Sequence, residues 1–118
     1  MTITTLSLNL VEGSVSFSFT PSAAEQLKAE LVNLVNCLKT VAGKSGTGGT
    51  SRPTPQKSLE YQYAGDVFLE IFCNPNIWPS PFAAKVLVTV RDERIRLSTE
   101  AELTRVIEDV NQYLEHAR

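Results

Sequence analysis

The sequence predicts one α+β domain of 118 residues, with an antiparallel sheet of about six strands and two helices on one face of that sheet. Three observations predict this class. Several short runs alternate apolar and polar residues with the period of a β-strand. Two longer segments carry apolar residues at helical spacing. Turn signals between these segments give the order ββα, loop, ββββα.

The first hairpin is predicted at residues 6–19, where apolar residues alternate with polar ones on both sides of Glu12-Gly13. A two-residue turn at Glu12-Gly13 would place six apolar side chains on one face. The expected cross-strand pairs are Leu10 with Val15, Leu8 with Phe17, and Leu6 with Phe19.

A helix is predicted to follow, with Pro21 in its first turn and Ser22 to Glu25 as a capping box. Its apolar stripe continues to about Thr40, and we expect the helix to end near Gly43. Residues 43–57 contain Gly, Ser, Thr, Pro and basic residues but no acidic residue, so they predict a flexible basic loop inside the single domain 1–118.

Four strands and a second helix are predicted after the loop. Residues 59–63 and 67–73 flank a turn at 64–66, and the second of these strands is apolar on both faces, which favours a central position in the sheet. A turn at Asp92-Glu93 would pair Val90 with Ile95 and Val88 with Leu97. Thr99 to Glu102 reads as a capping box that opens the last helix.

Composition limits the classes of function. Hydrophobic residues make up 42% and charged residues 20%, as in globular proteins, and the formal net charge of −2 argues against a dedicated duplex-DNA binder. The N-terminus lacks a secretory signal and no run could span a bilayer, so we expect a cytoplasmic protein that is not in the membrane. Cys37 and Cys73 lie in apolar segments and are predicted to be buried free thiols.

No motif in the sequence specifies a catalytic chemistry. Residues 43–50 resemble a phosphate loop in composition, but no glycine precedes Gly43-Lys44 at the spacing that this motif requires. The one histidine, His116, lies at the end of the last helix, and no serine has a G-x-S-x-G setting. We therefore expect no catalytic residues, no metal site and no cofactor, and an enzyme is the third hypothesis.

Two segments could bind another macromolecule. In the predicted strands, aromatic and basic side chains share the face opposite the core, which is a pattern for stacking bases and contacting phosphates of a single-stranded nucleic acid. The alternative interpretations are protection of strand edges by charge and a second buried face. The candidate nucleic-acid-binding residues are Phe68, Phe72, Lys85, Arg91, Arg94 and Arg96.

The second candidate is the proline-rich segment 74–82, in which three prolines restrict the chain around rigid apolar side chains. Such side chains form hot spots in protein interfaces, although they could equally close one end of the core. The candidate protein-binding residues are Ile77, Trp78 and Phe82.

The element order resembles a shortened Whirly-like fold, the single-stranded-nucleic-acid-binding type, as found in small cyanobacterial proteins of unknown function. The local likeness lies at residues 58–61 (Ser-Leu-Glu-Tyr) and 67–70 (Val-Phe-Leu-Glu), whereas the Gly/Trp-rich opening of those relatives is missing from residues 1–13. The resemblance implies a noncatalytic sheet platform and a dimer in which helices pack across an interface.

The leading hypothesis is thus a noncatalytic accessory or adaptor protein that binds a protein partner, or itself, through the segment around Trp78 or through a sheet surface. A single-stranded nucleic-acid binder is the alternative.

Overall fold

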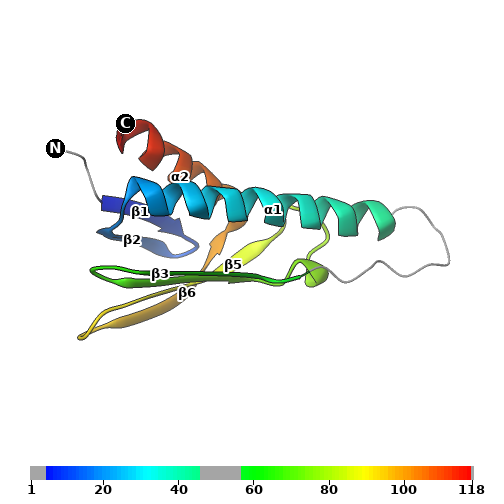
Figure 1. The fold of residues 1–118 in the computed structure, drawn as a ribbon. Helices are drawn as coiled ribbons and strands as arrows, with labels where there is room; N and C mark the ends of the chain where they lie inside the picture. The colour runs from blue at the N-terminus through cyan, green and yellow to red at the C-terminus, as the bar shows by residue number, and fades with distance from the viewer. Residues whose placement is uncertain (1–4, 46–56, 118) are drawn as a thin grey trace.

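The computed structural model describes residues 5–45 and 57–117, and it has the predicted α+β class and element order (Figure 1). Most of the predicted loop 43–57 therefore lies outside the described residues. The elements are β1 (Thr5–Leu10), β2 (Gly13–Ser18), α1 (Pro21–Ser45), β3 (Leu59–Ala64), β4 (Phe68–Cys73), a short 3-10 turn η1 (Pro75–Ile77), β5 (Lys85–Arg91), β6 (Arg96–Glu102) and α2 (Leu103–Ala117).

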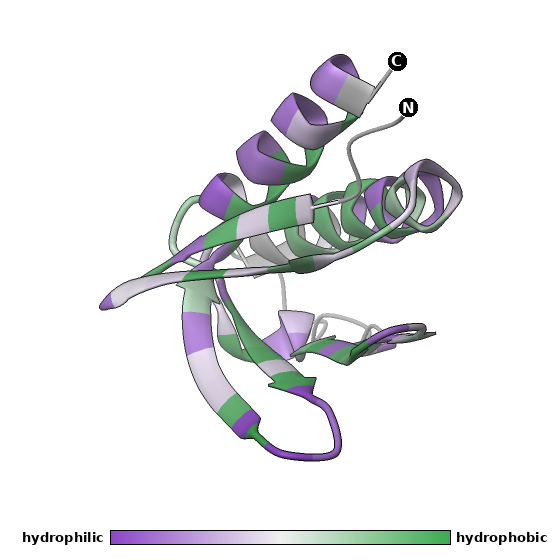
Figure 2. Cartoon of the chain, turned by 90° about the vertical axis from the view of Figure 1, so that its left-hand side faces the viewer, coloured by the Kyte–Doolittle hydropathy of each residue, from purple (hydrophilic) through white to green (hydrophobic). Residues whose placement is uncertain are grey.

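The six antiparallel strands are divided between two sheets. β1 and β2 form a hairpin of their own, and the other four strands form a sheet in the order β3-β4-β5-β6. β4 is central, as its apolar sequence predicts. Both helices and the β1–β2 hairpin lie on the same side of the four-stranded sheet, so within the described residues no helix covers the other face of that sheet (Figures 1 and 2).

The core lies between the helices, the hairpin and the covered face of the sheet. Phe19 is 1% exposed and packs edge-to-face on Phe17, Tyr63 and Tyr113. The Tyr113 hydroxyl donates to the Phe19 carbonyl at 3.0 Å, and the Tyr61 hydroxyl donates to a carbonyl of α1 at 3.2 Å. These bonds satisfy buried polar atoms, and they join α2 to the connection between β2 and α1, and β3 to α1.

The first hairpin has a different register from the one predicted. Val11-Glu12 forms the turn, Gly13 begins β2 with φ 135°, and the predicted turn at Glu12-Gly13 was wrong. Phe19 lies beyond the strand, because its ring packs among the tyrosines rather than opposite Leu6. The observed pairs are Leu10 with Gly13, Leu8 with Val15, and Leu6 with Phe17.

The hairpin of β5 and β6 also differs from prediction, since its loop has four residues, Asp92–Ile95, instead of two. The Asp92 carboxylate accepts the backbone N–H groups of Arg94 and Ile95 at 2.7 and 2.9 Å, which closes this wider loop. Those bonds also hold the pKa of the Asp92 carboxyl below its ordinary value. Val90 consequently pairs with Leu97, and Val88 with Thr99.

Both helix starts differ from the predicted capping boxes. Thr20, not Ser22, caps α1, because its hydroxyl accepts the Ala23 N–H at 3.1 Å. The segment from Thr99 to Glu102 is strand instead of a helix start: β6 pairs with β5 as far as Glu102, and the N–H of Leu103 donates to the Ala84 carbonyl at 3.0 Å. In the first turn of α2, the N–H of Leu103 is thus satisfied by the backbone before β5 instead of by a side-chain cap.

Candidate interface on the open face of the sheet

The face of the four-stranded sheet that carries no helix is here called the open face. Side chains alternate along each strand, and Leu69, Ile71 and Val88 are examples that point the other way and are fully buried in the core. The open-face positions belong to β3 (60, 62, 64), β4 (68, 70, 72), β5 (85, 87, 89, 91) and β6 (96, 98, 100, 102).

Strand register arranges most of these residues in three rows that run across all four strands. The basic row lies at the end with the β3–β4 and β5–β6 turns, and the acidic row lies four residues further along each strand. The basic row is Ala64, Phe68, Arg91 and Arg96; the middle row is Gln62, Glu70, Thr89 and Ser98; the acidic row is Glu60, Phe72, Leu87 and Glu100.

The acidic row contains the main apolar surface of the open face. Phe72 and Leu87 are cross-strand partners, and they are 39% and 45% exposed. Glu60 and Glu100 flank this pair on the two outer strands. An exposed apolar pair between two carboxylates is suited to an apolar side chain with a cation beside it.

The basic row joins the aromatic and cationic residues predicted from the sequence. The Arg91 guanidinium lies over the Phe68 ring, 4.3 Å from its centroid, and Arg96 is the direct cross-strand partner of Arg91. A hollow of about 590 Å³ lies beside them and is lined by Gly65–Phe68 and Arg91–Arg94.

Not all predicted nucleic-acid residues share this row. Arg94 lies in the β5–β6 loop, so its predicted place on a strand face was wrong. Phe72 belongs to the acidic row, and Lys85 lies beyond it, opposite Glu102. The open face therefore has its cations at both ends, and carboxylates lie between them.

The proline-rich segment has two kinds of apolar side chain. Ile77 and Phe82 are 67% and 83% exposed, whereas Trp78 is half-buried and packs against the core. The indole N–H of Trp78 donates to the Cys73 sulfur; burial is the larger effect and raises the pKa of that thiol to about 11. Trp78 thus closes one end of the core in this structure, and Ile77 and Phe82 are accessible.

A second apolar surface, which the sequence reasoning missed, is a groove of about 260 Å³ between α1 and α2. Val32 is 51% exposed there, and the Oδ1 atom of Asn111 is buried with no hydrogen-bond partner. Helical spacing could have found it, because Val32 and Val35 extend the apolar stripe of α1 beyond the residues that face the sheet.

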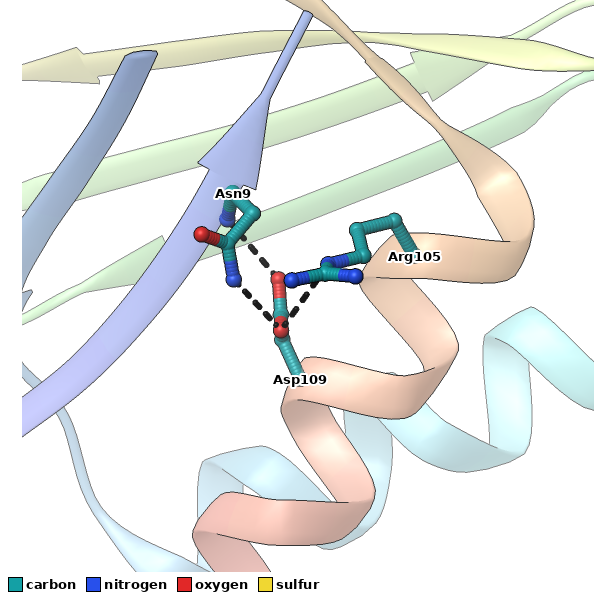
Figure 3. Close-up of polar contacts among 3 residues, drawn as sticks. All are labelled: Asn9, Arg105 and Asp109. Carbon is teal, nitrogen blue, oxygen red and sulfur yellow. Dashed lines mark hydrogen bonds and ion pairs between the residues drawn. The ribbon is translucent and has the colours of Figure 1, made fainter.

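The polar cluster between β1 and α2 has a structural role. Asp109 is 5% exposed and accepts hydrogen bonds from the backbone N–H and the side-chain amide of Asn9, with the Nε of Arg105 at 3.9 Å (Figure 3). His116, on the same helix, donates from Nδ1 to the Gln112 carbonyl at 2.8 Å. Both Asp109 oxygens are thus occupied in joining β1 to α2.

The described residues contain neither a metal-binding cluster nor a helix that could span a membrane. Among residues 5–45 and 57–117, no three His, Cys, Asp or Glu side chains are grouped so that they could hold a metal ion. Over the same part of the chain, neither helix has a stretch apolar and long enough to cross a lipid bilayer. Both cysteines are free thiols, with Cys73 buried and Cys37 half-buried.

Comparisons with protein-family models, curated proteins and solved structures give no match to this chain.

Proposed function

We propose that this chain is a noncatalytic protein-binding module whose interface is the open face of the four-stranded sheet. The observation that carries the proposal is the acidic row, where the exposed pair Phe72–Leu87 lies between Glu60 and Glu100. Interfaces combine an apolar centre with a polar rim, and this row has both. The partner is a protein surface with an apolar side chain flanked by cations.

A strand face without a helix is also a rigid support. Every strand of the sheet is hydrogen-bonded to a neighbour, and the opposite face is anchored in the core. Side chains on such a support lose little conformational freedom on binding, which favours affinity.

The test is capture of proteins from an extract of the source cells on the immobilised chain. The variants are Leu87→Glu on the open face and Val32→Glu on α1, which are matched because both residues are exposed aliphatic side chains of similar exposure. We expect wild type and Val32→Glu to retain a protein that Leu87→Glu loses.

The captured protein is then identified by mass spectrometry, produced in pure form and bound to the same three chains. Binding of the pure protein to wild type and Val32→Glu, but not to Leu87→Glu, supports the proposal. Equal binding to all three contradicts it. Circular dichroism checks that each variant is folded.

A single-stranded nucleic-acid binder is the second candidate function, and the stacking of Arg91 on Phe68 beside Arg96 favours it. This row could support one base and contact one or two phosphates. The open face as a whole carries four carboxylates and three cations, which opposes a phosphate backbone crossing it, so we place this function second.

A labelled single strand tests this second function at low ionic strength. Binding should weaken steeply with salt and disappear when Arg91 and Arg96 are both changed to Glu. A strand that does not bind the wild type at low salt excludes this function.

A further inference from the structure

We propose that the partner on the open face is a second copy of this chain, packed face to face with its strands antiparallel to those of the first. This inference rests on the proposed function, because it names the protein that occupies the same surface. The order of charged residues along the strands favours this arrangement.

The basic row has an uncompensated pair of like charges. Arg91 and Arg96 are directly opposite each other on neighbouring strands, an arrangement that destabilises a sheet when nothing compensates it. Over the described residues, neither guanidinium is within ion-pair distance of a carboxylate. The position of Arg91 is determined by the Phe68 ring below it, so its charge stays on the open face.

The acidic row carries unpaired negative charge, whereas the basic row carries unpaired positive charge. Within the described chain, Glu60 and Glu100 form no ion pair, and the two carboxylates flank apolar side chains that remain exposed to water. This row needs cations next to an apolar or aromatic side chain, and the basic row of the same molecule has both.

A two-fold axis along the middle row exchanges these two rows. Each outer row is two residues from the middle row, or about 7 Å along the strands, so the rows match in distance as well as in charge. Phe68 then meets Phe72 of the second copy, and Arg96 meets Glu100 of the second copy. The contact is isologous and closes as a dimer.

Charge selects this arrangement over the parallel one. An axis along the strands would place the basic row on the basic row and the acidic row on the acidic row, and both contacts would be repulsive. Antiparallel stacking makes both contacts attractive. Sheets that pack face to face keep their strands within about 30° of alignment, which this geometry allows.

The middle row contains one unfavourable contact. Glu70, which accepts a hydrogen bond from Gln62 at 3.2 Å, approaches its own counterpart near the axis. Thr89 beside it is only 5% exposed and offers little contact area. The Glu70→Gln variant should therefore dimerise several-fold more tightly than wild type.

The size of the face predicts a weak dimer. Six-residue strands are about 20 Å long and four strands span about 15–19 Å, so each copy contributes roughly 300–380 Å² of flat area, which is below the about 1,200 Å² in total at which standard specific interfaces begin. We expect a dissociation constant of micromolar order.

Sedimentation equilibrium over about 1–500 µM protein tests the inference. One double variant reverses the basic row (Arg91→Glu with Arg96→Glu), and another reverses the acidic row (Glu60→Arg with Glu100→Arg). Each should be monomeric where wild type is dimeric. An equal mixture of the two should form a heterodimer, because residue 96 of each chain then meets a residue 100 of opposite charge.

The control reverses two charges away from the face, Lys28→Glu with Lys39→Glu on α1, and should dimerise like wild type. Leu87→Gln is a second disruptive variant, which removes apolar surface from the acidic row without changing its charge, and circular dichroism checks the fold of all chains. A monomeric wild type, a charge variant that dimerises normally, or a mixture that stays monomeric would each overturn the inference.

The proposed function can fail separately. If wild type is monomeric and Leu87→Glu still loses a captured protein, the open face binds a different protein and only the second-copy inference is wrong. If Leu87→Gln does not weaken self-association and Leu87→Glu does not reduce capture, the open face is not an interface and both proposals fail.

Discussion

Asp109 on α2 joins the last helix to Asn9 on β1, a residue 100 positions earlier, through two hydrogen bonds of 2.8 and 2.9 Å (Figure 3). We predict that Asp109→Ala lowers the free energy of unfolding by about 3 kcal/mol, because hydrogen bonds to a charged group are lost and the Asn9 N–H is left without a partner. Urea denaturation followed by circular dichroism measures the change. Glu108→Ala, at the exposed neighbouring position, is the control and should shift stability by less than about 0.5 kcal/mol. Equal destabilisation by the two variants would contradict the prediction.

Trp78 should matter for stability, unlike the two exposed side chains of its segment. Trp78→Ala removes packing against the core and the bond to Cys73, so we expect a loss of about 3 kcal/mol in the free energy of unfolding. Ile77→Ala and Phe82→Ala should each change it by less than about 0.5 kcal/mol. The midpoints of urea denaturation distinguish these outcomes. If Trp78→Ala were as stable as wild type, Trp78 would not be part of the core.

The raised pKa of Tyr61 predicts that the protein loses stability at alkaline pH. Burial, with a smaller effect of the neighbouring Tyr63, raises the pKa of Tyr61 from 10.0 to about 12. The unfolded chain therefore releases this proton first, so the folded state loses stability as pH rises from about 10 towards 12, and it has the full contribution below pH 10. Thermal denaturation between pH 9 and pH 12 should show a steeper decline for wild type than for Tyr61→Phe. Parallel declines would show that Tyr61 titrates normally.

The buried side chain of Asn111 is expected to lower the free energy of unfolding. Its Oδ1 atom is buried without a hydrogen-bond partner beside the apolar groove between the helices. Asn111→Leu replaces the amide by an apolar group of similar volume, which should raise the free energy of unfolding by about 1 kcal/mol. Thermal denaturation compares it with Gln112→Leu, an exposed position on the same helix that should gain nothing. A less stable Asn111→Leu chain would show that the amide has a partner in solution.

The class and the order of the elements could be predicted from sequence because alternation and helical spacing extend over whole segments. The register could not, since it depends on turn chemistry: the Asp92 carboxylate closes a four-residue loop, and Phe19 leaves its strand to pack among tyrosines. In both hairpins the observed strand register differs from the predicted one by two residues. Because a difference of two residues leaves each side chain on the same face of the sheet, the predicted faces are correct although the predicted registers are wrong.

The candidate site was predictable in part for the same reason. The alternation of side chains along each strand predicts that Phe68, Arg91 and Arg96 lie on one face. The observed strand register places them in one row. The acidic row could not be predicted from the sequence. Glu60 and Glu100 are 40 residues apart, and they lie in the same row only because β4 and β5 pair between their strands. Pairing between distant segments carries no local signal in a single sequence.

The bond between Asn9 and Asp109 also constrains when this protein can fold. The β1–β2 hairpin is synthesised first, yet α2, near the other end of the described chain, covers its apolar side. Until α2 leaves the ribosome, Leu6, Leu8 and Phe17 remain open to water and to other nascent chains. Long sequence separations between contacting residues slow folding, and exposed apolar strands promote aggregation. Chains stalled before residue 103 should therefore depend on chaperones to stay in solution.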